Sequence, residues 1–339
     1  MKHARRIKTV FLLLLAAVIA LLGGTAAHMS RRQERYQVAM IVKSTESAFF
    51  QSVFAGAGAA ATEYNVSLIT EGPESEEDYA TQNEMIYKAV ENGADALVIS
   101  AVDFNKNAEA VDWAAAKGIP VVVIDSDVNS SAVKFRIGTD NEEAGRMAAR
   151  AALDGTDGEL FIGIVNFDEN TANGQQREQG FREEAKKDSR VKEIVTINVP
   201  SAIDDTRAAT KGLLSTHPEI NVITTFNEWT SLGVGWAIRD LNKKDDISVV
   251  AFDSNAVSVG MLETGEVDAL IVQNPYAMGY LGVEKAWEIL SRRGVEGDKL
   301  DTETTLVTRE NLFLDEYQKI LFLFALLAPV CSAPSLSAF

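Results

Sequence analysis

Polar side chains recur where short apolar runs of the sequence end. Asp253 follows the run at 248–252, and Gln273 follows the run at 269–272. Such runs are typical of buried parallel strands, and open α/β sheets place their ligand-binding groups at the carboxyl ends of strands. Five more polar residues stand just past predicted strands: Ser47, Ser100, Asp125, Ser126 and Asn227. Helix capping is the alternative interpretation for each residue alone, whereas their convergence on one rim of each sheet favours a binding site.

Two adjacent aromatic residues, Phe49 and Phe50, come shortly after the first predicted strand. An aromatic face covers the C–H side of a sugar ring, while carboxylate and amide groups exchange hydrogen bonds with its hydroxyls. A buried polar site also discriminates strongly, because an analogue that lacks a hydroxyl leaves a protein group unpaired. This combination predicts a site for a neutral polyol. Core packing is the alternative for the two phenylalanines, and we expect one of them to serve it.

Catalytic constellations are absent from the sequence. His3 and His28 lie in the amino-terminal region and His217 precedes a proline, so a Ser-His-Asp triad or a histidine metal site lacks its residues. The single Cys331 excludes a disulfide within the chain and a cysteine metal cluster. The GAGAAA stretch lacks the third glycine of a dinucleotide fingerprint. We therefore expect no enzyme and no cofactor; hydrolysis by carboxylates alone is the catalytic alternative that stays open.

Predicted strands and helices alternate along the chain. The strands are expected at 38–42, 66–70, 96–99, 120–124, 133–137, 160–165, 193–199, 222–226, 248–252, 269–272 and 304–307. The helices are expected at 50–64, 79–91, 106–117, 142–153, 175–187, 204–214, 231–241, 257–262 and 277–291. Alternation of this kind requires parallel sheets with helices on both faces. With 339 residues, 46% of them apolar, we predict an α/β fold of two doubly wound parallel-sheet lobes joined by crossing strands.

The charge and the two ends of the sequence limit its partners. Lys and Arg number 32 against 49 Asp and Glu, a net charge of −17 that argues against binding nucleic acid. Basic residues, an apolar run at 10–22 and small residues predict that 1–27 is a cleaved signal peptide or an uncleaved membrane anchor, the only part to contact a membrane. Both interpretations place the rest of the chain outside the cytoplasm. Residues 325–339 are expected to be a disordered tail.

Several motifs in order give the sequence a family resemblance over about residues 36–322. They include NGADALVIS, GIPVVVIDSDV, IGTDNEEAGRMAA, NGQQREQGF, ISVVAFDSN and IVQNP. The chain resembles the type I periplasmic binding proteins, in the ribose- and galactose-binding branch that shares its fold with lactose-repressor effector domains. The resemblance implies that the sugar lies in a cleft between the two lobes.

The resemblance also implies which residues bind the sugar. The stacking aromatics, the cleft aspartates, the arginine, the asparagine and the glutamine fall on Phe49, Phe50, Asp125, Asp253, Arg177, Asn227 and Gln273. Ser47 and Ser100 stand where the family has asparagines, Ser126 replaces an arginine and Ile203 replaces a phenylalanine. The last two departures argue against ribose itself. Trp229 is a candidate replacement ring, with a core role as the alternative.

The family's mechanism is hinge closure, in which a ligand biases an equilibrium between open and closed lobes. The implied lobes are 36–139 plus 274–302 and 140–273 plus 303–324, with a three-segment hinge near 138–140, 273–275 and 300–304. Similar proteins deliver a monosaccharide or related polyol to the permease of an ABC importer. The alternative function is a sugar-sensing extracytoplasmic domain that signals to a membrane receptor or histidine kinase.

Overall fold

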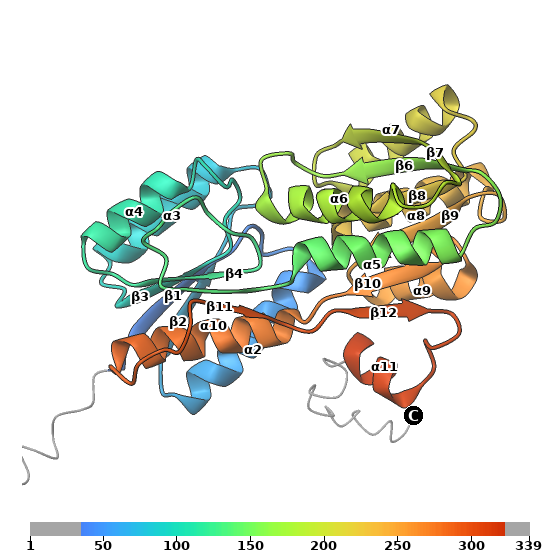
Figure 1. Cartoon of the computed structure of the whole chain (residues 1–339). Helices are drawn as coiled ribbons and strands as arrows, with labels where there is room; N and C mark the ends of the chain where they lie inside the picture. The colour runs from blue at the N-terminus through green and yellow to red at the C-terminus, as the bar shows by residue number, and fades with distance from the viewer. Residues whose placement is uncertain (1–34, 323–339) are drawn as a thin grey trace, which may run out of the picture. The chain divides into compact units, whose positions relative to one another are not determined.

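The computed structural model describes residues 35–322, which form two six-stranded sheets with helices packed on them (Figure 1). The predictions for residues 1–27 and 325–339 lie outside the described residues. Within 35–322, no helix is both long enough and apolar enough to cross a membrane.

The first sheet has the order β2-β1-β3-β4-β5-β11, and all of its strands are parallel. Its strands are β1 (Gln37–Ile41), β2 (Ser67–Glu71), β3 (Ala96–Ile99), β4 (Val121–Ile124), β5 (Phe135–Gly138) and β11 (Lys299–Asp301). Its helices are α2 (Ala48–Glu63), α3 (Tyr79–Glu91), α4 (Ala108–Ala116) and α10 (Pro275–Leu290). Every residue of β3 and β4 is buried, as expected of apolar strands that are covered on both faces. We call this sheet and its helices the N-terminal lobe.

The second sheet repeats this plan in the order β7-β6-β8-β9-β10-β12, with only β12 antiparallel to its neighbour. Its strands are β6 (Leu160–Asn166), β7 (Val191–Asn198), β8 (Val222–Thr225), β9 (Ser248–Phe252), β10 (Ala269–Val272) and β12 (Thr305–Thr308). Its helices are α5 (Asn141–Asp154), α6 (Ala172–Ala185), α7 (Ile203–Thr216), α8 (Glu228–Leu241), α9 (Ala256–Thr264) and α11 (Asp315–Leu321). We call this sheet and its helices the C-terminal lobe. The predicted α/β class with two parallel-sheet lobes is confirmed.

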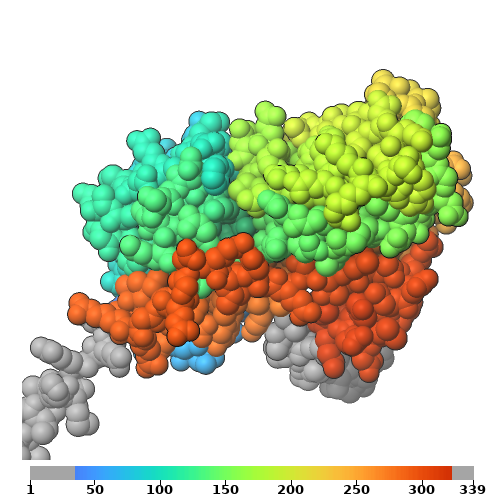
Figure 2. Space-filling model, viewed as in Figure 1, coloured from blue at the N-terminus to red at the C-terminus, as the bar shows by residue number. Residues whose placement is uncertain are grey.

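Within the described residues, the chain passes between the two sheets three times. The crossings lie between β5 and α5, between β10 and α10, and between β11 and β12, at the segments predicted as hinges. Figure 2 shows the last of them, coloured orange to red, on the surface across both lobes. Their action as hinges stays a prediction, as do the predicted lobe boundaries.

The predicted elements differ from the structure mainly at their ends. Two elements were not predicted: the edge strand β11, whose three residues KLD carry no apolar run, and helix α11. Helix α8 begins at Glu228, three residues before the predicted 231, because the side chain of Asn227 accepts a hydrogen bond from the backbone N–H of Thr230 and caps it. This earlier start places Glu228 in the first turn.

Glycines bring two helix pairs into close contact, α2 with α10 in the N-terminal lobe and α5 with α6 in the C-terminal lobe (Figure 1). A side-chain carbon at Gly145 would collide with the backbone carbonyl of Arg177, and one at Gly279 would collide with the carbonyl of Val53. Only glycine allows backbones to approach so closely. In each pair, a helix that follows a crossing (α5 or α10) is therefore packed tightly onto a helix that carries predicted site residues (α6 or α2).

Candidate functional site

A small cavity lies between the lobes, where the carboxyl ends of both sheets meet. Twelve residues line it: Lys43, Ser47, Phe49, Phe50, Glu76, Asp125, Asn173, Arg177, Asn227, Glu228, Asp253 and Gln273. Its volume is about 20 Å³, room for about one water molecule, so the two lobes are closed upon each other. The structure thus brings together eight of the eleven residues that the sequence and the resemblance proposed.

Asp125 and Asp253 reach the cavity through the same backbone conformation. They follow β4 and β9, which hold equivalent places in the two sheet orders. Both have left-handed backbone conformations, with φ of 55° and 67°, and their N–H groups donate to the carbonyls of Ile137 and Ile271. Aspartate is among the few non-glycine residues that adopt this conformation at modest cost. Neither aspartate caps a helix, so the capping alternative does not account for these two residues.

Arg177 is at the centre of the C-terminal wall of the cavity and is only 1% exposed. Its guanidinium donates to Asn141 Oδ1 at 2.9 Å, to the carbonyl of Phe226 at 2.6 Å and to Gln273 Oε1 at 2.6 Å. It also lies 4.8 Å from the ring centroid of Phe252. Burial lowers the pKa of Arg177 from its usual value, and the nearby aspartate charges oppose that effect. These contacts fix the guanidinium in one orientation.

Gln273 links Arg177 to Asp253. Its Oε1 also accepts from Thr139 Oγ1 at 2.8 Å, and its Nε2 donates to Asp253 Oδ1 at 2.6 Å. Burial raises the pKa of Asp253 to about 7, although the charge of Arg177 and the bond from Gln273 act in the opposite direction. The carboxyl of Asp253 therefore titrates near neutral pH.

The N-terminal wall is built from a helix start and from one aspartate. Ser47 caps α2 by accepting from the N–H of Phe50 at 3.1 Å and also lines the cavity, so its capping and site interpretations both apply. The rings of Phe49 and Phe50 lie edge to face with centroids 5.1 Å apart, and both pack on the core of this lobe. Asp125 accepts from Asn173 Nδ2, in the other lobe, at 3.1 Å.

Three proposed residues do not line the cavity. Ser100 lies behind it and donates through Oγ to Asp125 Oδ2 at 2.8 Å. Ser126 is fully buried, and its Oγ has no hydrogen-bond partner in the described part of the chain. Trp229 packs against the core of the C-terminal lobe, in keeping with its core alternative.

Sequence reasoning missed four lining residues: Lys43, Glu76, Asn173 and Glu228. Lys43 is 3% exposed, with Nζ 4.0 Å from Glu76 Oε2 and 5.2 Å from the ring centroid of Phe167 in the other lobe. Glu76 accepts from Ser201 Oγ at 2.9 Å, and Ser201 accepts from Asn227 Nδ2 at 2.7 Å. Glu76 lies in an acidic loop between β2 and α3, and nothing in the local sequence distinguishes it from the exposed acidic residues beside it.

Glu228 stands out among the missed residues because its carboxylate crosses between the lobes. It accepts from the backbone N–H groups of Ala48 and Phe49, at 3.3 and 3.0 Å, and from Asn255 Nδ2 at 2.8 Å. Burial raises the pKa of Glu228, while these bonds lower it. Recognising Asn227 as a helix cap would have placed Glu228 on the same rim. Among the described residues, no group of His, Cys, Asp or Glu side chains could hold a metal ion.

Two doubly wound sheets, three crossings and a polar cavity between them define a two-lobed binding protein. The chain belongs to the periplasmic binding protein domain family, whose model matches residues 38–294. The D-ribose/D-allose-binding protein of Pseudomonas aeruginosa is 26% identical over 312 residues, covering 87% of this chain and 97% of the relative. The ribose import binding protein of Bacillus subtilis is 26% identical over 269 residues, covering 79% and 86%.

A solved structure is similar over most of the chain. It is the solute-binding protein of a carbohydrate transporter from Agrobacterium radiobacter, in complex with D-arabinose. It is 29% identical, with a TM-score of 0.81, and the match covers 85% of this chain and 99% of that one. The resemblance to a periplasmic sugar-binding protein of the ribose and galactose branch is thereby confirmed.

Proposed function

We propose that this chain is an extracytoplasmic solute-binding protein that captures a monosaccharide or related polyol by lobe closure and delivers it to an ABC importer. The observation that carries the proposal is the cavity, where carboxylates, amides, a guanidinium and two phenylalanine rings from both lobes converge. The relatives support it, because they are a ribose and allose binder, a ribose import protein and a carbohydrate transporter component.

The cavity offers both kinds of hydrogen-bonding partner that a sugar hydroxyl needs. Asp125, Asp253 and Glu76 accept, whereas Arg177 and Asn173 donate. A hydroxyl both donates and accepts, so a ring that carries several of them satisfies such a mixed wall better than an anion or an apolar ligand would. We propose that Phe49 or Phe50 covers the apolar face of the ring.

Capture requires the lobes to separate, because the closed cavity of about 20 Å³ is far smaller than the roughly 300 Å³ or more of typical ligand pockets. We propose that the three crossings act as the hinge and that the sugar contacts both lobes when they close around it. Ligand contacts that exist only in the closed form then shift the equilibrium, and an importer permease recognises that form.

A thermal-shift screen followed by calorimetry tests the proposal. The probes are D-ribose, D-allose, D-arabinose, D-fucose and myo-inositol, with sodium acetate as a non-sugar control. At least one polyol is expected to raise Tm in a concentration-dependent way, as binding to the folded state requires. Failure of every polyol to shift Tm or to release heat up to millimolar concentration would contradict the proposed function.

A further inference from the structure

One contact between the lobes joins a carboxylate to the first N–H groups of a helix. Glu228 is the first residue of α8 in the C-terminal lobe, and it is 7% exposed. Its two carboxylate oxygens accept from the N–H groups of Ala48 and Phe49, the first two residues of α2 in the N-terminal lobe. Asn255, which caps α9 in the C-terminal lobe, donates a third hydrogen bond to the carboxylate of Glu228.

The physics of a helix start makes this contact favourable. The first N–H groups of a helix have no partner within the helix, and the helix dipole attracts negative charge there. In the described part of the chain, no ion pair includes Glu228, and its hydrogen-bond donors are these two N–H groups and Asn255. A bidentate carboxylate on two backbone donors also fixes the direction in which α2 meets the other lobe.

At the cavity, the other hydrogen bonds between the lobes use side chains whose polar atoms could turn to a ligand. Asn173 on Asp125 and Ser201 on Glu76 are of this kind. A backbone bond from the N–H of Phe104 to the carbonyl of Asn170, at 3.0 Å, also joins the lobes, but neither residue lines the cavity. The bonds of Glu228 end on the backbone of α2, which cannot rotate away as a side chain can. The contact also lies next to Phe49 and Phe50, the two aromatic residues of the N-terminal wall.

We propose that Glu228 is a positioning residue that latches the two lobes in the closed form through protein atoms alone and holds the Phe49–Phe50 pair in place. The protein then populates the closed form before it meets a ligand, and the sugar adds to an equilibrium that the latch has already shifted. The role of the latch in capture depends on the proposed function, but the distance between the lobes can be measured without any sugar.

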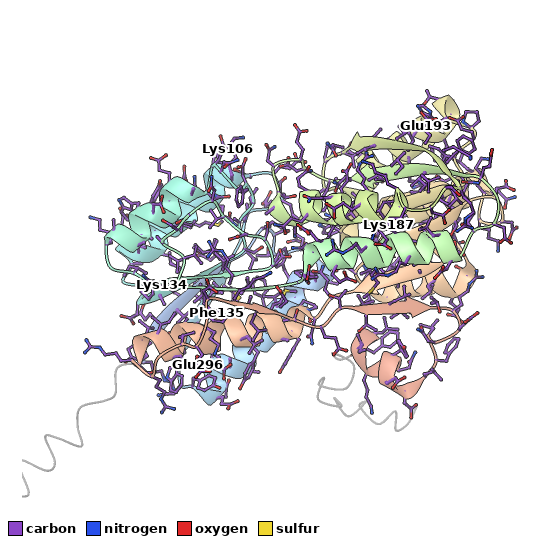
Figure 3. The ribbon with its side chains drawn as sticks, viewed as in Figure 1. Lys106, Lys134, Phe135, Lys187, Glu193 and Glu296 are labelled. Carbon is purple, nitrogen blue, oxygen red and sulfur yellow. The ribbon has the colours of Figure 1, made fainter. Side chains whose placement is uncertain are left out.

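Single-molecule energy transfer between two dyes measures that distance. Lys106 and Lys187 are 51% and 67% exposed and lie in different lobes (Figure 3), so the protein is labelled as Lys106→Cys and Lys187→Cys in a Cys331→Ser background. Without sugar, Glu228→Gln is expected to lower the ratio of closed to open molecules roughly tenfold, because an amide has one acceptor for two N–H donors. Asp240→Asn is the matched control. It removes a carboxylate from the same helix that pairs with Arg207 within one lobe, and should leave the ratio unchanged.

A second variant keeps the test decisive should Glu228→Gln fail to fold. Ala48→Pro removes one of the two donors, and proline is well tolerated at the first position of a helix. It should lower the closed ratio by a smaller factor. An unchanged ratio in the folded variants, or an equal fall in Asp240→Asn, would overturn the latch. If no sugar binds but the ratio of closed to open molecules falls in Glu228→Gln, the latch is supported and the proposed function is contradicted. If a sugar binds but this ratio is unchanged, the proposed function is supported and the latch is contradicted.

Discussion

The two walls of the cavity are held in different ways. In the C-terminal wall, the polar side chains bond mainly to one another and to their own lobe, with Arg177, Gln273 and Asp253 forming one connected set. In the N-terminal wall, Asp125 and Glu76 accept from residues of the opposite lobe. The Arg177–Gln273–Asp253 set is therefore arranged within its own wall, whereas Asp125 and Glu76 gain part of their hydrogen bonds only when the lobes close.

This difference suggests a division of labour within the proposed site. A preorganised wall binds with little loss of side-chain entropy, so we expect the ligand to meet the C-terminal lobe first. The N-terminal wall exchanges its contacts with the other lobe for contacts with the ligand.

Arg177→Ala should have the largest effect, because the side chain is fully buried and satisfies three acceptors of its own wall. We expect a fall of about 3 to 5 kcal/mol in the free energy of unfolding, measured by urea denaturation, together with loss of sugar binding. Arg150→Ala, which removes a half-exposed surface arginine, should cost less than about 1 kcal/mol. Similar losses of unfolding free energy in the two variants would show that Arg177 does not hold the wall together.

Asp253 makes the free energy of unfolding depend on pH. Its pKa is raised from 3.8 to about 7, so the folded protein holds a proton between these values that the unfolded chain has lost. The contribution of this group to stability is full below about pH 4 and is lost as pH rises to about 7. Asp253→Asn should flatten this decline and raise the free energy of unfolding at pH 8 by as much as about 4 kcal/mol.

The same variant should bind sugar at least roughly tenfold more weakly, because an amide offers one acceptor where the carboxylate offers two. Chemical denaturation from pH 4 to 8 and calorimetry with the best polyol of the screen give the two readouts. A variant that is both less stable at pH 8 and unchanged in affinity would show that Asp253 is structural and ionised.

Gly145→Ala tests whether the helix pair α5–α6 sets the position of Arg177. The added carbon would meet the carbonyl of Arg177, and we expect a loss of about 1 to 3 kcal/mol in unfolding free energy and weaker sugar binding. Gly58→Ala on α2 is the control, since nothing lies within 4 Å of its added carbon. It should be neutral or stabilise by up to about 1 kcal/mol. The comparison fails if both alanines behave alike.

Ser100→Ala should have the smallest measurable effect, and it acts on the N-terminal wall. It removes the 2.8 Å bond that orients Asp125, so affinity should fall by about 1 kcal/mol, or several-fold. Ser126→Ala should leave affinity unchanged and should keep or raise stability, because its buried Oγ is unpartnered in the described residues. A larger loss of affinity in Ser126→Ala than in Ser100→Ala would contradict the arrangement of this wall.

The fold and the positions of the strand-end residues could be predicted from the sequence, because both depend on local patterns; the roles of these residues in binding stay predictions. A short apolar run followed by Asp125 or Asp253 marks a buried strand and its ligand-side end in the printed letters alone. Capping and binding are not exclusive alternatives, because Ser47 and Asn227 each cap a helix and also line the cavity.

Residues that depend on long-range contact could not be found in this way. Glu76 and Ser201 meet across 125 positions of sequence, and Glu228 meets Phe49 across 179. Their loops and helix ends carry no periodicity that points to a partner. Ser126 and Trp229 do not line the closed cavity, because a strand-end position or an aromatic ring does not determine whether a side chain reaches it.

The left-handed backbone at Asp125 and Asp253 limits how this protein could be retargeted. A library randomised at either position should return asparagine and glycine as the other well-expressed choices, since longer or branched side chains strain that conformation. New ligand preferences should therefore arise by changes around the two aspartates, at Lys43, Glu76 or Ser47, none of which has a left-handed backbone.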